Sequence, residues 1–141
     1  MQILLSKSLR RLSRLYSRAI VKVLPDLRLE HYAEIILLLA STQHTPTHKE
    51  LAELFQVDKS RIAVLIEGMT KNGFVYTEQN VADRRAHFIY LTNRGKESVP
   101  KIQEAIEQVN HMINKQVDKT HLDHFYETLF KMQSNLVDIA L

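Results

Sequence analysis

The sequence predicts a mainly α-helical fold with a single two-stranded β-hairpin. Most of the chain repeats apolar residues at helical spacing, whereas one segment after Gly73 is rich in aromatic and β-branched residues. The chain has 141 residues, a formal net charge of +3 and no cysteine. A chain of this length is expected to form one domain over residues 1–141 with a core of its own.

Four helices are predicted before Gly73. Apolar residues at positions 5, 9, 12, 16, 19, 20 and 23 predict a long amphipathic helix that Pro25 ends. The run from Leu29 to Ala40 is apolar on all sides, which predicts a buried central helix. Thr47 and Glu50 have capping-box spacing before a short helix over residues 48–55, and Asp58 is placed to cap a fourth helix that ends at residues 72–73.

The third and fourth helices have the arrangement of a helix-turn-helix. A short turn containing Val57 joins them, and we expect Val57 to fill the space between the two helices. The fourth helix has an apolar side of Ile62, Leu65, Ile66 and Met69, and an outward side of Lys59, Ser60, Arg61, Val64, Gly68 and Lys71. In a helix-turn-helix, the second helix enters the major groove of DNA, where an arginine can bond guanine O6 and N7.

The hairpin after this helix predicts a wing. The stretches "FVYTEQ" and "AHFIYL" predict its strands, and "NVADRR" predicts the turn between them. Arg84 and Arg85 lie near its tip, where arginines can enter a narrow, electronegative minor groove. We expect Asp83 to form an ion pair with one of these two arginines.

Two further helices are predicted after the hairpin. Thr92 is placed to cap a helix with apolar residues at 99, 102, 106, 109, 113 and 117, and a last helix begins near Thr120. The long helices at the two ends of the chain have more apolar surface than a small core can cover, which predicts self-association. The fold class is therefore a winged helix-turn-helix over residues 44–92, with a central helix and dimerisation helices in residues 1–42 and 93–141.

Two stretches resemble one family. "LAELFQVDKSRIAVLIEGMTKNGFV" and "DRRAHFIYLTNRG" are similar to the motifs of the MarR family of bacterial transcriptional regulators. The resemblance implies a homodimer that binds a palindromic operator in double-stranded DNA, as a repressor released by a small ligand. The predicted DNA-binding residues are Thr47, Lys59, Ser60, Arg61, Val64, Asp83, Arg84 and Arg85.

The outward side of the fourth helix departs from the family pattern. Members often have small hydroxyl residues and an arginine there, whereas this chain has Arg61, Ala63, Val64 and Gly68. Because these positions contact bases, we do not expect the operator sequence of other members to apply to this chain.

The resemblance also implies an effector site. Family members commonly bind small aromatic or hydrophobic compounds where the dimerisation helices meet the winged helix. In this chain the first, second and fifth helices would form that crevice, and Arg14, His31 and Tyr32 have suitable chemistry for an aromatic carboxylate. Thiol oxidation cannot be the signal because the chain has no cysteine.

Charge and composition limit the other functions. Residues 1–25 contain six basic side chains and no acidic one, which permits a polyanionic partner. No run of about 18 apolar residues or signal-peptide pattern occurs, so we expect a cytoplasmic bacterial protein with no membrane contact. The three glycines form no phosphate loop, and no hydrolase motif is present, so we expect neither an enzyme nor a cofactor.

Two alternatives remain open from the sequence. The first alternative is a zinc-responsive regulator of the same fold. Glu107 and His111 are spaced to share one helical face, and His121 lies near His124 in the sequence. No third or fourth ligand is evident, and no metal site is predicted. The other alternative is a winged-helix module that docks on acidic protein surfaces through its arginines.

Overall fold

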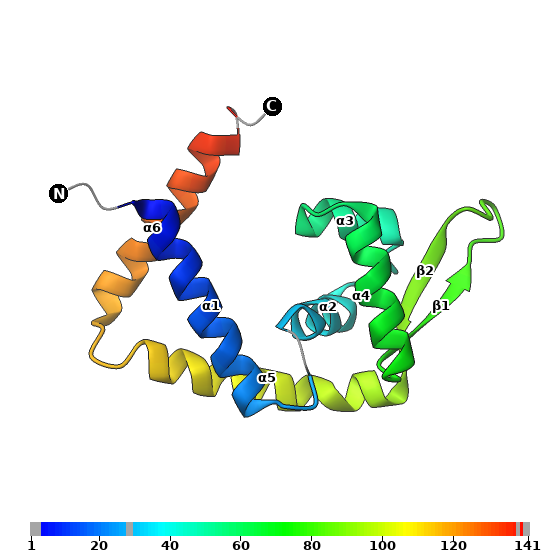
Figure 1. Ribbon diagram of the computed structural model, residues 1–141, viewed down its shortest axis with the longest axis horizontal. Helices are drawn as coiled ribbons and strands as arrows, with labels where there is room; N and C mark the ends of the chain where they lie inside the picture. The colour runs from blue at the N-terminus through cyan, green and yellow to red at the C-terminus, as the bar shows by residue number, and fades with distance from the viewer. Residues whose placement is uncertain (1–3, 28–29, 138, 140–141) are drawn as a thin grey trace. The chain divides into compact units, whose positions relative to one another are not determined.

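The computed structural model describes residues 4–27, 30–137 and 139 (Figure 1). Over these residues the order is α1 (Leu5–Val23), α2 (Glu30–Ser41), α3 (His48–Phe55), α4 (Lys59–Lys71), β1 (Val75–Gln79), β2 (His87–Leu91), α5 (Asn93–Ile113) and α6 (Lys119–Val137). The chain divides into two compact units, one up to Val109 and the other from Asn110 onward. The mainly helical architecture with one hairpin is therefore confirmed.

Helix α1 has the predicted bounds, and Ile20 anchors its C-terminal half in the core. For α2, the predicted start at Leu29 lies outside the described residues. Ile35 and Ile36 of α2 are buried, but Glu34 and Ala40 are exposed, so the expectation of burial on all sides was wrong. Glu34 is a charged residue on the outer side of α2, and Ala40 lies where the end of the helix reaches the surface.

Helices α3 and α4 form as their caps predict. The Thr47 hydroxyl accepts a hydrogen bond from Glu50 N at 3.2 Å, and Glu50 Oε2 accepts one from Thr47 N at 3.4 Å. Gln56 adopts a left-handed conformation with φ of 52°, which ends α3 and starts the turn. Val57 packs against the core between the two helices, as expected.

The core of the first unit joins helices α2 to α5 and the hairpin, and Ile20 of α1 is buried as well. Its most deeply buried side chains include Ile36 of α2, Leu51 of α3, Ile62 and Met69 of α4, and Ile102 of α5, each 0% exposed. Because both ends of α4 are represented, the whole apolar side of this helix is fixed on the core. Its outer side is thus held in one orientation.

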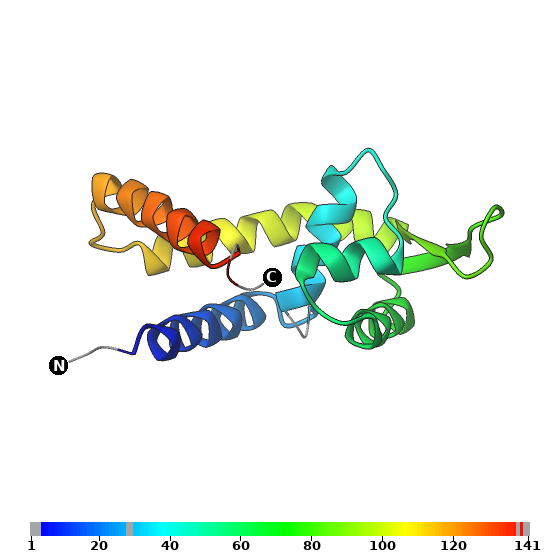
Figure 2. The ribbon, with the colours of Figure 1, turned by 90° about the horizontal axis from the view of Figure 1, so that it is seen from above.

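The strands pair antiparallel, with Val75 opposite Leu91 and Gln79 opposite His87. Figure 2 shows the hairpin extending beyond α3 and α4. A third segment joins it, because Thr47 forms an isolated bridge with Phe88 and Ile89 N donates to Pro46 O at 3.1 Å. The residue that caps α3 is therefore also attached to the second strand of the hairpin.

The predicted cap of α5 is present. Gly95 N donates to the Thr92 hydroxyl at 3.0 Å, and that hydroxyl donates to the carbonyl of Gly73. A Cβ on Gly95 would lie 2.2 Å from the carbonyl oxygen of Phe74, so only glycine fits where α5 crosses the start of β1. These contacts fix the base of the hairpin against α5.

In the second unit, α6 begins at Lys119, one residue before the predicted cap at Thr120. Leu122 N donates to the carbonyl of Asp118, which closes the first turn. No described residue of α6 is buried. Its apolar side is thus available for a contact with another molecule.

Candidate nucleic-acid interface

Asp58 fixes the N-terminus of α4. Its Oδ1 accepts hydrogen bonds from Arg61 N at 2.8 Å and from the Ser60 hydroxyl at 2.7 Å. These bonds, the Ser60 bond first, hold the pKa of the Asp58 carboxyl below its ordinary value. The Ser60 hydroxyl hydrogen is therefore used within the cap, which leaves only its oxygen lone pairs for an external partner.

The outward side of α4 offers two distinct kinds of contact. Arg61 is exposed, and Val64 is 69% exposed beside it. Lys71, at the other end of the helix, forms an ion pair with Glu67, with 3.1 Å between Nζ and Oε1. Hydrogen-bonding and apolar contacts are thus concentrated in the first half of the helix.

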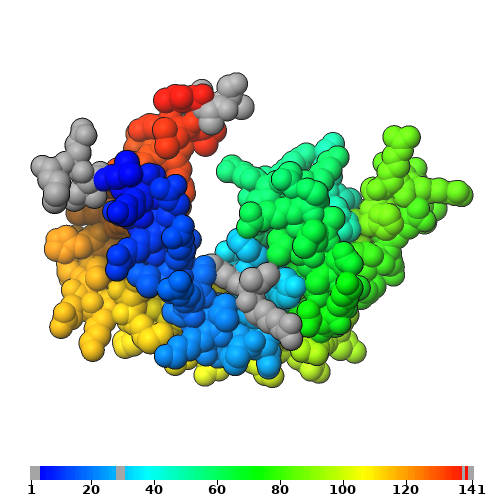
Figure 3. Space-filling view, in the orientation of Figure 1, coloured from blue at the N-terminus to red at the C-terminus, as the bar shows by residue number. Residues whose placement is uncertain are grey.

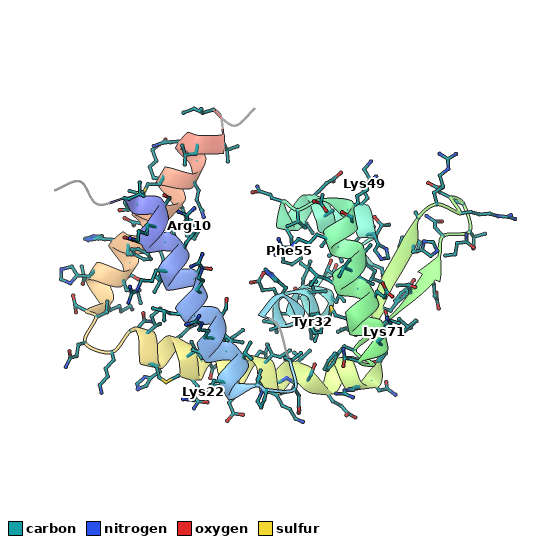
Figure 4. All side chains as sticks on the ribbon, in the orientation of Figure 1. Arg10, Lys22, Tyr32, Lys49, Phe55 and Lys71 are labelled. Carbon is teal, nitrogen blue, oxygen red and sulfur yellow. The ribbon has the colours of Figure 1, made fainter. Side chains whose placement is uncertain are left out.

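Gly68 does not belong to this outward side, contrary to expectation. It is half-buried, and a Cβ at this position would lie 2.3 Å from the hydroxyl oxygen of Tyr32. Tyr32, labelled in Figure 4, comes from α2. Its ring meets that of Phe74 edge-on, with 6.4 Å between the ring centroids. The glycine therefore serves the packing of α2 against α4.

The tip of the hairpin is ordered by its own hydrogen bonds. Asp83 Oδ1 accepts from Arg85 N at 3.0 Å, and Gln79 Nε2 donates to Arg84 O at 2.7 Å. The expected ion pair between Asp83 and an arginine was wrong, because the Asp83 carboxylate binds the backbone instead. Arg84 and Arg85 both remain exposed, and no described acidic side chain forms an ion pair with either.

A groove of about 630 Å³ lies between the start of α3, the start of α4 and the hairpin. Its lining consists of Thr47, His48, Lys49, Lys59, Ala63, Asp83, Arg85, Ala86 and His87. Three permanent cations thus surround one carboxylate, and the N-terminal ends of two helices add partial positive charge. Such a groove attracts the phosphate groups of a nucleic acid.

The predicted DNA-binding residues divide into two groups. Thr47, Lys59, Asp83 and Arg85 line the groove, whereas Ser60, Arg61, Val64 and Arg84 do not. Arg61, Val64 and Arg84 are nonetheless exposed, on α4 and at the tip of the hairpin.

His48, Lys49 and His87 also line the groove, and sequence reasoning missed them. The two imidazole rings meet edge-on with centroids 6.3 Å apart, and burial lowers the pKa of His48. The capping box could have indicated His48 and Lys49, because it places them in the first turn of α3. His87 needed knowledge of the pairing between the hairpin and the α3 region.

The predicted effector residues come from α1 and α2 and differ in exposure. Tyr32 is buried at 7% exposure, His31 is half-buried, and Arg14 is exposed on α1. A cavity of about 220 Å³ does form among α1, α2 and α5, but its lining is Tyr16, Ile20, Ala33, Glu34 and Ile106. None of the three predicted residues lines this cavity, and an effector site at the meeting of these helices stays a prediction.

The histidines do not assemble a metal site in the part of the chain that the structure describes. No group of three His, Cys, Asp or Glu side chains is close enough there to hold an ion. At the exposed start of α6, His121 Nδ1 instead lies 3.9 Å from Asp118 Oδ2. Among the described residues, no helix has the length and apolar character needed to cross a membrane.

Comparisons with known proteins agree with this geometry. Residues 35–87 match the model of the MarR family, and a comparison with curated proteins found no significant match. A crystal structure of MarR has a TM-score of 0.84 at 23% identity, covering 98% of this chain and 94% of that one.

Two other solved structures are similar over nearly their whole length. The transcriptional regulator PA3341 has a TM-score of 0.77 at 25% identity, with 94% of this chain and 98% of that chain covered. A MepR–DNA complex from S. aureus has a TM-score of 0.86 at 18% identity, with 95% and 99% covered. Residues 35–87 thus match the MarR family, and the fold of the whole chain is similar to that of MarR.

Proposed function

We propose that this chain is a sequence-specific, DNA-binding transcriptional regulator that acts as a homodimer and has no catalytic activity. The observation that carries the proposal is the cationic groove between α3, α4 and the hairpin, beside an exposed recognition side of α4. The similar MepR structure is a complex with DNA, which supports the same use of this fold here.

The two groups of interface residues would have separate tasks. Lys49, Lys59 and Arg85 would hold phosphates, and the two helix N-termini would add backbone dipoles. Arg61 and Val64 would contact base edges in the major groove, Arg61 through guanine and Val64 through a thymine methyl group. Arg84 would follow the backbone at the minor groove.

A homodimer is supported by apolar side chains that each unit leaves exposed. On α1 these are Leu5, Leu9 and Leu12, which are 52%, 39% and 41% exposed. On α6, Phe125 and Phe130 are 46% and 61% exposed. A two-fold dimer would read a palindrome whose half-sites are roughly 34–36 Å apart, or a multiple of that distance.

Repression and release by a ligand form the finer part of the proposal. A ligand releases DNA only if it binds one dimer geometry more tightly than the other. The cavity among α1, α2 and α5 has about 220 Å³ and lies where such a ligand would change the position of α1 against α2 and α5. It is smaller than the ~300 Å³ typical of ligand pockets, so ligand entry would require it to widen. A direct role for Tyr32 would require that widening as well.

Selection of bound sequences from randomised duplex DNA tests the proposal. The selected duplex is then titrated by fluorescence anisotropy at about 50 and 200 mM NaCl. An enriched palindrome bound by a dimer, with lower affinity at the higher salt concentration, is the expected result. Salt-sensitive binding without enrichment would contradict sequence-specific regulation, and absence of binding would favour the protein-docking module.

A further inference from the structure

Helix α1 carries two rows of side chains on opposite sides. One row consists of Lys7, Arg10, Arg11, Arg14 and Arg18, which we call the basic row. The other consists of Leu5, Leu9, Leu12, Tyr16 and Ile20, which we call the leucine row. The spacing of three and four residues within each row places its members on one face of the helix. The proposed dimer covers the leucine row, so the basic row stays at the surface.

The basic row has no counter-charge along its own helix. All five of its side chains are exposed, and residues 1–25 contain no acidic residue. Among the described residues, none of the five forms an ion pair. Like charges three and four residues apart repel each other on a helix, so an external anion would relieve this repulsion. Figure 3 shows α1 on the visible surface of the molecule.

The chemistry of the row favours phosphate. Four of its five members are arginines, whose planar guanidinium groups donate two parallel hydrogen bonds to a phosphate. Together with Leu15 they line a shallow hollow of about 540 Å³ (Arg10 is labelled in Figure 4). From Lys7 to Arg18 the row extends for about 16 Å at the rise of an α-helix. Such a length fits several consecutive phosphates rather than a single one.

The leucine row argues against a membrane as the source of these phosphates. A helix that lies on a membrane inserts its apolar side among the lipids, with its basic side chains at the headgroups. Here Ile20 is 1% exposed because that end of the leucine row packs on the protein core. In the proposed dimer the exposed leucines at the other end of the row are covered as well. This side is then not available to lipid, whereas a nucleic-acid backbone needs only the basic row.

We propose that the basic row of α1 is a second, sequence-independent binding surface for the phosphate backbone of duplex DNA, distinct from the groove beside α4. The two surfaces share no residue. The proposal goes beyond the proposed function and rests on it only in taking the leucine row as the dimer interface. Each phosphate that the row neutralises releases counter-ions and increases the salt dependence of binding.

The test is a charge-matched pair of triple variants of the full chain. One variant carries Arg10→Gln, Arg14→Gln and Arg18→Gln. The control carries Lys101→Gln, Lys115→Gln and Lys131→Gln, which removes the same charge from exposed positions on α5, α6 and the segment between them. Both are titrated by anisotropy against a duplex of random sequence over a range of NaCl concentrations.

The α1 variant is expected to reduce the slope of log K against log salt by about 2–3, since each phosphate contact contributes about 0.9. The control should stay within about 0.5 of the original protein in the same slope. The ratio of operator to random-sequence affinity should not change in either variant. Equal slopes for the α1 variant and the control would overturn the proposal.

Three further arms keep the result unambiguous. In a background of Lys59→Gln, Arg61→Gln and Arg85→Gln, we expect binding to a random duplex to persist. It should weaken further when Arg10→Gln, Arg14→Gln and Arg18→Gln are added to that background. If the three α1 substitutions do not change DNA binding in that background, the basic row does not bind DNA. Sequence-specific binding through α4 would not be contradicted by that result.

A variant with Arg10→Lys, Arg14→Lys and Arg18→Lys should keep the salt slope of the original protein, because it keeps the charge. Loss of the slope in that variant would mean that folding, not charge, had changed, and would overturn the proposal. Binding to phosphatidylserine vesicles that depends on the basic row, with an unchanged slope on DNA, would assign the row to lipid instead.

Discussion

Helices α1 and α4 both have a cationic side opposite an apolar side, but they differ in how those sides are held. The apolar side of α4 is buried, with Ile62 and Met69 at 0% exposure, whereas Leu9 and Leu12 of α1 are 39% and 41% exposed. The cations of α4 are accompanied by Asp58 and Glu67, whereas α1 has no acidic residue. A helix fixed on the core can present its side chains in a defined direction, which base recognition requires, whereas a uniformly basic helix supplies attraction alone.

The largest difference should appear when each apolar side is truncated. Ile62→Ala is expected to lower the free energy of unfolding by about 2–5 kcal/mol, because it leaves a cavity in the core. Leu12→Ala is expected to affect the monomer–dimer equilibrium more than the unfolding of the monomer. Chemical denaturation at several protein concentrations measures both effects. If Leu12→Ala reduces stability equally at every concentration, the leucine row is not part of a dimer interface.

Gly68→Ala tests how α4 is held against α2. Alanine has a higher helix propensity than glycine, yet its Cβ would meet the Tyr32 hydroxyl at 2.3 Å. We expect a net destabilisation of about 1–3 kcal/mol from the overpacked contact. With Tyr32→Phe in the same chain, the next atom is at 3.5 Å, and Gly68→Ala should then be neutral or stabilising. A thermal-denaturation double-mutant cycle without this coupling would contradict the assigned contact.

Arg61→Ala and Arg85→Ala should separate base contact from phosphate contact. Arg61→Ala is expected to cost about 1–3 kcal/mol of discrimination at one position of each half-site. Arg85→Ala should weaken binding to operator and scrambled DNA alike and reduce the salt slope by about 1. Lys71→Ala is a control on the same helix, because Lys71 is paired with Glu67. Equal losses on both DNAs for Arg61→Ala would instead assign Arg61 to a phosphate.

The smallest effect is the acid sensitivity of the α4 cap. Because the folded protein lowers the pKa of Asp58 below its ordinary 3.8, the ionised carboxylate contributes stability above that pH. The contribution is lost as the pH falls through the lowered, folded-state pKa. Asp58→Asn keeps a capping side chain and should make the melting temperature less dependent on pH below about 4. Identical pH profiles for the two proteins would exclude this contribution.

The local features of the fold could be predicted from the sequence. The bounds of α1, both caps around the helix-turn-helix and the hairpin all depend on residues within a few positions of each other. Capping and periodicity are local properties, so a single sequence contains them.

The features that were missed depend on contacts between distant segments. Gly68 is next to Tyr32 only because α2 packs on α4, and His87 is next to His48 only because Thr47 pairs with the hairpin. The sequence allows the Asp83 carboxylate to bind either an arginine side chain or a backbone N–H. In the turn of the hairpin it accepts a hydrogen bond from Arg85 N. Sequence spacing identified which residues are exposed at the interface better than which of them share a groove.

Thr47 connects two parts of the interface that are distant in the sequence. It caps α3 through Glu50 N and bridges to Phe88, while its neighbour Pro46 accepts a hydrogen bond from Ile89 N. A wing that swung away from the protein would therefore break its bridge to the residue that caps α3. In amide hydrogen exchange, Glu50 and Ile89 should consequently open in a single cooperative event, so that the wing and the helix-turn-helix meet DNA as one stiff unit.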